Sequence, residues 1–223
     1  LLLFVQAFCD LSLPDYTSDI INVGIQQKGI EDGVPEKIRE ESMDRLFLFM
    51  DHEDRELVQT DYSLTDGVYE LKDINEEERE NLNSILGIPE LIVTGLSDPS
   101  SQEVTQIKEQ MGLDQDADIF QVLEQLPEEQ LSQMLSGMEG QFEEMPDSIV
   151  TQSAVLFVQE EYSAQGEDLD QMQMNYILLT GGKMLGLAFL GMAAAITVTF
   201  LSARVAATLG RNLRNSVYRK VLS

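Results

Sequence analysis

Residues 175–203 read NYILLTGGKMLGLAFLGMAAAITVTFLSA, and this stretch decides the fold because Lys183 is its only charged residue. From Met184 to Ala203 there are 20 consecutive uncharged residues. A helix rises about 1.5 Å per residue, so this length covers the roughly 30 Å hydrocarbon core of a bilayer. The stretch therefore predicts a transmembrane helix.

The residues after this stretch indicate which way the helix points. Five cations and no acid follow Ala203: Arg204, Arg211, Arg214, Arg219 and Lys220. Because the cytoplasmic ends of membrane helices carry an excess of Lys and Arg, we expect residues 204–223 in the cytoplasm. The residues before the helix are then expected outside.

The charge of the rest of the chain has the opposite sign. All 40 acids lie between Asp10 and Asp170, together with only eight bases. A surface this acidic repels phosphate, which argues against nucleic acid as a partner and against close contact with anionic lipid headgroups. We interpret the acids as the solvated surface of an external domain.

The chain opens on a second apolar run, LLLFVQAFCDLSLP at residues 1–14. The run is too short to span a bilayer, and it lacks the basic n-region and the A-x-A cleavage site of a signal peptide. We expect residues 1–27 to be the outer end of a first membrane helix, which leaves the bilayer at Pro14, and its exit. With Cys9 as the single cysteine, no intrachain disulfide can form.

The expected fold is therefore mainly α, with transmembrane helices flanking an acidic, mostly helical extracellular domain at residues 28–168. About 140 residues are enough for a core without disulfides. Residues 169–223 hold the second membrane helix and its cytoplasmic extension. Asp66-Gly67, between two short alternations of apolar and polar residues, favours one short β-hairpin.

Capping residues mark the helices expected in the domain. Pro35 can open one, Asp51 with Asp54 can cap a second, and Asn75 with Glu78 forms a box-like pair at the start of a third. Gly87 and Pro89 are expected to end that third helix, and ELIVTG at residues 90–95 is a weaker extended candidate.

Further helices are expected over 101–111, from Asp118, from Pro127 and from Pro146. The last of these is expected to bury Ile149, Val150, Leu156 and Val158.

Motifs for catalysis or metal binding fail their spacing tests. Asp114, Asp116 and Asp118 match the first ligands of a calcium loop, but Ile119 and Gln125 stand where that loop needs Gly and Glu. His52, the only histidine, has no second ligand nearby in sequence. We therefore predict no catalytic, cofactor-binding or metal site in these residues.

Small residues and one cation give the membrane helix its character. Gly182 and Gly186 form G-x-x-x-G, and Gly191 and Ala195 continue small residues at four-residue spacing, which lets another helix approach closely. Lys183 either extends to the headgroups or faces a water-filled cavity of a transport pathway. Beyond Ala203 one apolar stripe continues and predicts a partner helix: Val205, Leu209, Leu213, Val217 and Val221.

Two segments resemble a known family. SARVAATLGRNLRNSVYRKVLS at 202–223 resembles the end of the second membrane helix in type IV ABC exporters, with Ala203 to Ala206, Leu213-Arg214, Tyr218 and Lys220-Val221 at the matching positions. LPDYTSDIINVGI at 13–25 resembles the outer end of that family's first helix. The departure is the long insert between them, which resembles the external domain on one subunit of some heterodimeric bacterial exporters.

This resemblance implies a multi-pass protein of the bacterial plasma membrane that pairs with a second half-transporter subunit. It implies ATP and Mg²⁺ in a cytoplasmic domain outside these residues, and an amphiphilic small-molecule, lipid or peptide substrate. Residues of the cytoplasmic extension would belong to the lever that couples ATP hydrolysis to transport: Arg204, Arg211, Leu213, Arg214 and Tyr218. The acidic domain would lie over the outer mouth of the pathway as a lid, a substrate selector or an assembly clamp.

Two other classes share the same order of segments. A sensory receptor or sensor kinase also places an external domain between two membrane helices, but usually has a Pro soon after the second helix, and here none follows Pro146. An adhesion or structural ectodomain explains the acidic domain but not the apolar cytoplasmic stripe.

Overall fold

The computed structural model describes residues 2–98, 101–111, 114, 117–126, 131 and 145–221. The chain divides into two compact units: residues 1–29 with 173–223, and residues 30–172. We call them unit 1 and unit 2. The prediction of a mainly helical chain is confirmed.

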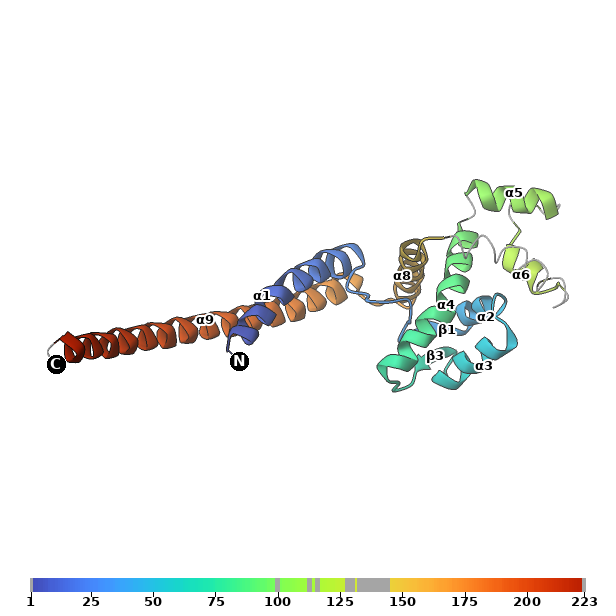
Figure 1. The fold of residues 1–223 in the computed structure, drawn as a ribbon. Coiled ribbons are helices and arrows are strands. Elements are labelled where there is room, and N and C mark those ends of the chain that lie inside the picture. Colours follow the sequence, from blue (N-terminus) through green and yellow to red (C-terminus); the bar gives the residue numbers. More distant parts are fainter. Residues whose placement is uncertain are drawn as a thin grey trace. The chain divides into compact units, whose positions relative to one another are not determined.

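Unit 1 is a pair of helices, which lie side by side in Figure 1. The first runs as α1 (Leu2–Asp19) and continues without a break as the π-helix η1 (Ile20–Gln26). The second is α9 (Leu169–Val221), whose first four residues belong to unit 2. Pro14 lies inside α1, and the turn that follows η1 contains Lys28 and Gly29, which both have positive φ.

Unit 2 begins with a short strand and two helices, β1 (Lys37–Arg39), α2 (Glu40–Phe47) and α3 (His52–Asp61). A hairpin of β2 (Tyr62–Thr65) and β3 (Val68–Leu71) comes next, then α4 (Glu76–Ser97) and α5 (Gln102–Met111). The unit closes with α6 (Ile119–Leu123) and α8 (Asp147–Ala164). The helix expected from Pro127 lies almost wholly outside the described residues.

The hairpin prediction is confirmed, and a third strand extends it. β1 and β2 both pair antiparallel with β3, in the order β1-β3-β2. The turn residues Asp66 and Gly67 have φ of 51° and 80°, the left-handed pair that a two-residue hairpin turn requires. The helix expected from Pro35 is wrong in its start, because residues 37–39 form β1 and α2 begins at Glu40.

The predicted helix caps are confirmed. In each, a side-chain oxygen accepts a hydrogen bond from a backbone amide in the first turn of the helix. Asp51 accepts from the Asp54 amide at the start of α3, and Asp118 from the Phe120 amide at the start of α6. Asn75 and Glu78 form the reciprocal capping box of α4. The sequence could predict these caps because a cap joins residues only two or three positions apart.

The long helix α4 overturns two sequence expectations. It continues through Gly87 and Pro89 to Ser97, so ELIVTG is helical and not extended. A proline inside a helix costs about 3 kcal/mol. Ile92 and Val93 are nearly fully buried, and such side chains each contribute about 1.5–3 kcal/mol, which offsets that cost.

The most extensive helix contact of unit 2 is between α4 and α8, and the core also takes in residues between 30 and 62 and residues of α6. A Cβ on Gly87 would lie 3.0 Å from Val150 Cγ1, so the two helices come close where α4 has no side chain. The buried face of α8 differs from the predicted one. Val158 is buried, but Ile149 and Leu156 are exposed, and the inward positions are Ala154, Val155, Phe157, Val158, Glu161 and Tyr162.

Two ion-pair networks fix residues 32–39 to the helices. Glu161 of α8 accepts from the Arg39 guanidinium at 2.9 and 3.0 Å and from the Ser42 hydroxyl at 2.7 Å. Burial acts to raise the pKa of Glu161, but the hydrogen bonds from Arg39 and Ser42 outweigh it and lower that pKa below its ordinary value. Arg79 of α4 in turn binds Asp32 at 2.6 Å and Glu36 at 2.8 Å.

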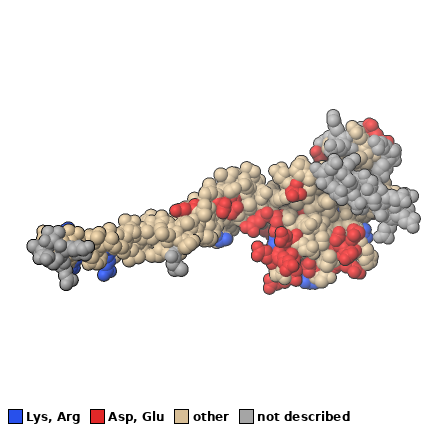
Figure 2. All heavy atoms as spheres, viewed as in Figure 1, with Lys and Arg blue, Asp and Glu red and all other residues tan. Residues whose placement is uncertain are grey.

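Unit 2 also carries the acidic surface. Figure 2 shows Asp and Glu side chains gathered over its visible face, whereas most of α1 and α9 is covered by uncharged residues. The buried acids of unit 2 are Glu90 and Glu161 among the described residues. The remaining described acids are at least partly exposed, as expected for groups that keep a domain solvated.

Gly33 offers a test of how closely its segment packs against α4 and α8. A Cβ there would lie 2.6 Å from Ala154 Cβ and 2.7 Å from Glu90 Oε2. We expect Gly33→Ala to lower the free energy of unfolding of unit 2 by about 1–3 kcal/mol, the usual cost of overpacking. The measurement is denaturant unfolding of the whole chain in detergent, followed by a probe in unit 2.

Gly95→Ala is the matched control, because among the described residues no atom outside its own stretch of helix lies within 4 Å of its Cβ position. In a helix this change should stabilise by roughly 0.5–1 kcal/mol. Equal effects of the two substitutions would contradict the packing around Gly33.

Candidate functional site

The candidate site is the helix pair of unit 1, because it contains the residues singled out in the apolar stretch 175–203. Two glycines give its register. A Cβ on Gly191 would lie 3.2 Å from Cys9 Cβ, and a Cβ on Gly24 would lie 2.9 Å from Ile177 Cγ1. From Cys9 to Gly24 is 15 residues forward along the first helix, and from Gly191 to Ile177 is 14 residues back along α9. The two helices are therefore antiparallel.

The face of α9 that turns toward α1 and η1 follows a seven-residue repeat. Its members alternate steps of four and three residues, and none of them is exposed: Gln173, Ile177, Thr180, Met184, Leu187, Gly191, Ala194 and Val198. A repeat of 3.5 residues is that of helices packed at a small crossing angle with a left-handed supercoil. Cys9 is fully buried in this contact.

The structure separates the small residues that the sequence analysis grouped. Gly191 packs against Cys9 and Ala195 is half-buried beside that contact. Gly182 and Gly186 are exposed, with nothing within 4 Å of their Cβ positions. At about 100° per residue, Gly182 lies about 200° around the helix from Thr180, so the G-x-x-x-G pair faces away from α1.

Large apolar side chains surround this open pair. Phe189, Ile196 and Phe200 follow Gly186 on the same side of α9, and each is more than 60% exposed. They form a second apolar face, distinct from the one that α1 covers. Lys183 is exposed between Gly182 and Met184 and does not point into the contact with α1.

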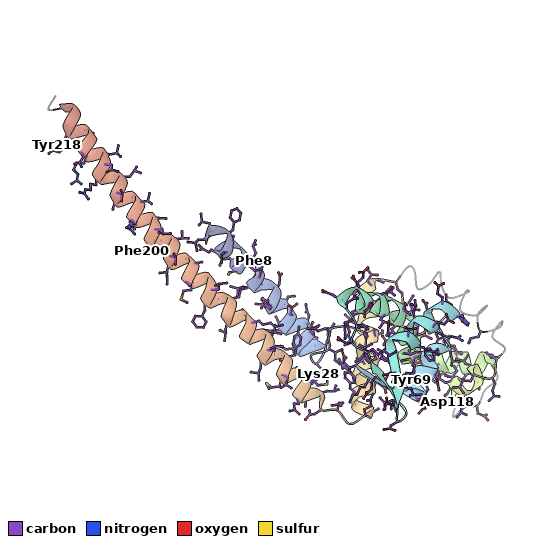
Figure 3. All side chains as sticks on the ribbon, turned by 90° about the horizontal axis from the view of Figure 1, so that it is seen from below. Phe8, Lys28, Tyr69, Asp118, Phe200 and Tyr218 are labelled. Carbon is purple, nitrogen blue, oxygen red and sulfur yellow. The ribbon has the colours of Figure 1, made fainter. Side chains whose placement is uncertain are left out.

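Polar contacts hold the end of the pair where η1 and the start of α9 meet. Lys28 Nζ lies 3.2 Å from Gln173 Oε1, and Gln173 Nε2 lies 3.4 Å from the Ile25 carbonyl oxygen. Figure 3 shows Lys28 at the turn beside this part of α9. Sequence reasoning missed these residues, because each is unremarkable until the antiparallel register brings residues 25–28 beside residue 173.

The residues predicted for the cytoplasmic lever lie on the last turns of α9. Arg204, Arg211, Leu213, Arg214 and Tyr218 are all exposed, and Figure 3 shows Tyr218 near the end of the helix. Val205, Leu209, Leu213 and Val217 are also exposed, each by 58 or 59%. The side chain of Val221 lies outside the described residues.

Among the described residues, one helix is long and apolar enough to cross a membrane, and the candidate span is Leu169–Asn215. The helix α1 does not meet that criterion, since it carries Asp10, Asp15 and Asp19. The described residues hold no group of three or more His, Cys, Asp or Glu side chains that could bind a metal ion. Asp116 of the calcium-like run lies outside the described residues.

Comparison with known proteins gives no relative: the sequence matches no protein-family model, and no curated protein or solved structure matches it.

The register can be tested with one introduced cysteine. Disulfides join Cβ atoms about 3.5–4.5 Å apart, and the Gly191 position lies close to that range from Cys9. We expect Gly191→Cys to form a disulfide with Cys9 on mild oxidation. The readout is whether fragments containing α1 and α9, produced by a protease site introduced in unit 2, stay joined until reduced.

Gly186→Cys is the control, because its open position faces away from α1. It should leave the two fragments separable under the same oxidation. Cross-linking at 186 as efficient as at 191 would contradict the register.

Proposed function

We propose that this chain is part of the transmembrane domain of an ATP-driven exporter of the type IV ABC class. The single observation that carries the proposal is the length of α9. Its 53 residues extend about 80 Å at about 1.5 Å per residue, far more than the roughly 30 Å of a hydrocarbon core. Such a helix can both cross the membrane and continue as a rigid rod beyond it.

The charge along α9 supports the direction of that rod. The residues from Arg204 onward carry five cations and no acids, while unit 2 carries all the acids except Asp10, Asp15 and Asp19. By the positive-inside rule the extension lies in the cytoplasm and unit 2 outside a bacterial plasma membrane. A cytoplasmic ATP-binding domain, with its ATP and Mg²⁺, would act on the extension, whose exposed apolar stripe gives it a surface for contact.

The antiparallel partner and the open face of α9 fit a multi-helix bundle. The first helix covers one face, and the face with Gly182 and Gly186 remains for another membrane helix of the same or a second subunit. We assign unit 2 the role of a lid over the outer mouth of the pathway. The substrate class is an amphiphilic small molecule, a lipid or a peptide.

A sensor or receptor ectodomain with flanking helices is the second candidate, favoured by the same segment order. The two differ in what the coding sequence holds beyond Ser223. The exporter requires further membrane spans and then a G-x-x-x-x-G-K-[ST] phosphate-binding loop, whereas a coiled-coil module with a signalling domain would replace the exporter by the sensor.

Orientation is tested by cysteine labelling in a Cys9→Ala background. Ser148 in unit 2 and Asn215 in α9 are both exposed, so each cysteine should react once reagent reaches its side. We expect Ser148→Cys to react with a membrane-impermeant maleimide in intact cells, and Asn215→Cys only after permeabilisation. The reverse pattern would contradict the assignment.

The lid is tested by removing unit 2 from the full transporter. Ile25 and Gln173 are in contact within unit 1, so residues 30–172 can be replaced by a short Gly-Ser linker without separating the helices. We expect ATP hydrolysis to persist while transport and its coupling to substrate change. Unchanged transport together with unchanged substrate stimulation of ATP hydrolysis, at equal membrane levels, would rule the lid out.

A further inference from the structure

Glu90, in the middle of the α4 sequence, is a buried acid without a hydrogen-bond partner among the described residues. Its side chain is completely inaccessible to solvent, and neither carboxyl oxygen has a hydrogen-bond partner among the described residues. One turn later on the same helix, the buried Thr94 hydroxyl oxygen also lacks one. Buried polar groups are nearly always satisfied, so three such atoms together call for an explanation.

Backbone encloses the carboxyl closely. A Cβ on Gly33 would lie 2.7 Å from Glu90 Oε2 and 2.6 Å from Ala154 Cβ, so residue 33 and α8 both approach this point of α4. The Gly33 amide donates to Asn83 Oδ1 at 2.8 Å and is not free to donate to Glu90. Glu90 thus lies at the junction of residues 32–36, α4 and α8.

The cation that binds residues 32–36 is already engaged. Arg79 of α4 binds both oxygens of Asp32, at 2.6 and 3.0 Å, and also Glu36. Polar groups of the other elements are engaged as well. The Tyr62 hydroxyl of β2 donates to the Pro35 carbonyl oxygen. On α8, Glu161 binds Arg39, and the Tyr162 hydroxyl accepts from the Glu36 amide. The charged group that acts electrostatically on Glu90 is Asp32, which has the same sign.

An ionised Glu90 would therefore be a buried charge beside a like charge and without a donor. A charge left in that state is strongly disfavoured relative to the same group in water. Burial, and after it the charge of Asp32, raises the pKa of Glu90 well above its ordinary value of 4.5. A neutral carboxyl, by contrast, carries no charge to be desolvated, so this enclosed position favours the protonated form of Glu90.

We propose that Glu90 is a proton-binding site of unit 2, and that the bound proton keeps residues 32–36 packed on α4 and α8. Loss of the proton requires water to reach the carboxylate, which separates residues 32–36 from the two helices. Residues 30–36 are also the covalent link from Gly29 of unit 1 into unit 2. The site makes this link sensitive to pH, independently of the proposed transport function.

The sign follows from the raised pKa. The folded chain holds the proton at pH values where the unfolded chain has lost it, so the stabilisation is complete below pH 4.5 and is lost as pH rises toward the folded pKa. The unfolding equilibrium constant of the wild type should rise up to tenfold per pH unit through this window. Glu90→Gln has a similar shape and cannot ionise, so that rise should be absent.

The test compares denaturant unfolding of the whole chain in detergent at several pH values from 4.5 to 8 for the wild type and two variants. Glu90→Gln should match the wild type at the acid end and be at least tenfold harder to unfold at pH 8. Glu80→Gln, at an exposed position of α4, controls for removing one negative charge and should keep the wild-type pH dependence.

Hydrogen exchange of the backbone amides of residues 32–34 and 36 gives a second readout that does not depend on global unfolding. Exchange should accelerate with pH more in the wild type than in Glu90→Gln, beyond the intrinsic pH effect common to both. Parallel pH dependences of the two chains in both measurements would overturn the proposal. So would stabilisation of the wild type, but not of Glu90→Gln, by Ca²⁺ or Na⁺ at pH 8, since the carboxylate would then hold a metal cation.

Discussion

The close approach of two helix backbones at glycines is the contact on which unit 1 depends. Gly24 and Gly191 each lie where a Cβ would meet a side chain of the other helix, at 2.9 and 3.2 Å. In the bilayer proposed for unit 1, no hydrophobic effect would drive the apolar helices together, and close van der Waals packing would take its place. Gly24 and Gly191 mark two separate points of this contact. Together they fix which residues of α1 and η1 face which residues of α9.

This constraint also explains what the sequence could not resolve. Small residues at four-residue spacing predicted close helix packing, and Gly191 shows it within the chain. The sequence could not tell that Gly182 and Gly186 belong to the other face, because the choice depends on where α1 lies. The seven-residue repeat from Gln173 to Val198 becomes recognisable only once Gly191 and Thr180 are known to be buried.

In unit 2, predictions succeeded where three or four neighbouring residues decide the structure. The Asp66-Gly67 turn and the caps at Asp51 and Asn75 are of this kind. They failed where distant residues decide it. Pro89 stays inside α4 because the following residues pack into the core, and β1 is a strand because residues 68–70 of β3 pair with it. The lone acid Glu90 gave no signal in the sequence at all, since its burial depends on α8 and on Gly33.

The exposed end of α9 is helical although its residues favour the helix only weakly, and the apolar stretch before it accounts for this. Residues 204–221 include Gly210, two asparagines and several β-branched residues, all weak helix formers. A separate peptide of this composition would be marginally helical in water, because starting a helix is the costly step. Here the apolar stretch before Ala203 supplies an already formed helix, in which a bilayer would hold every backbone hydrogen bond intact. Each further residue then only extends it, with Gly210 as the position of weakest propensity and the place where a rod of this length bends most easily.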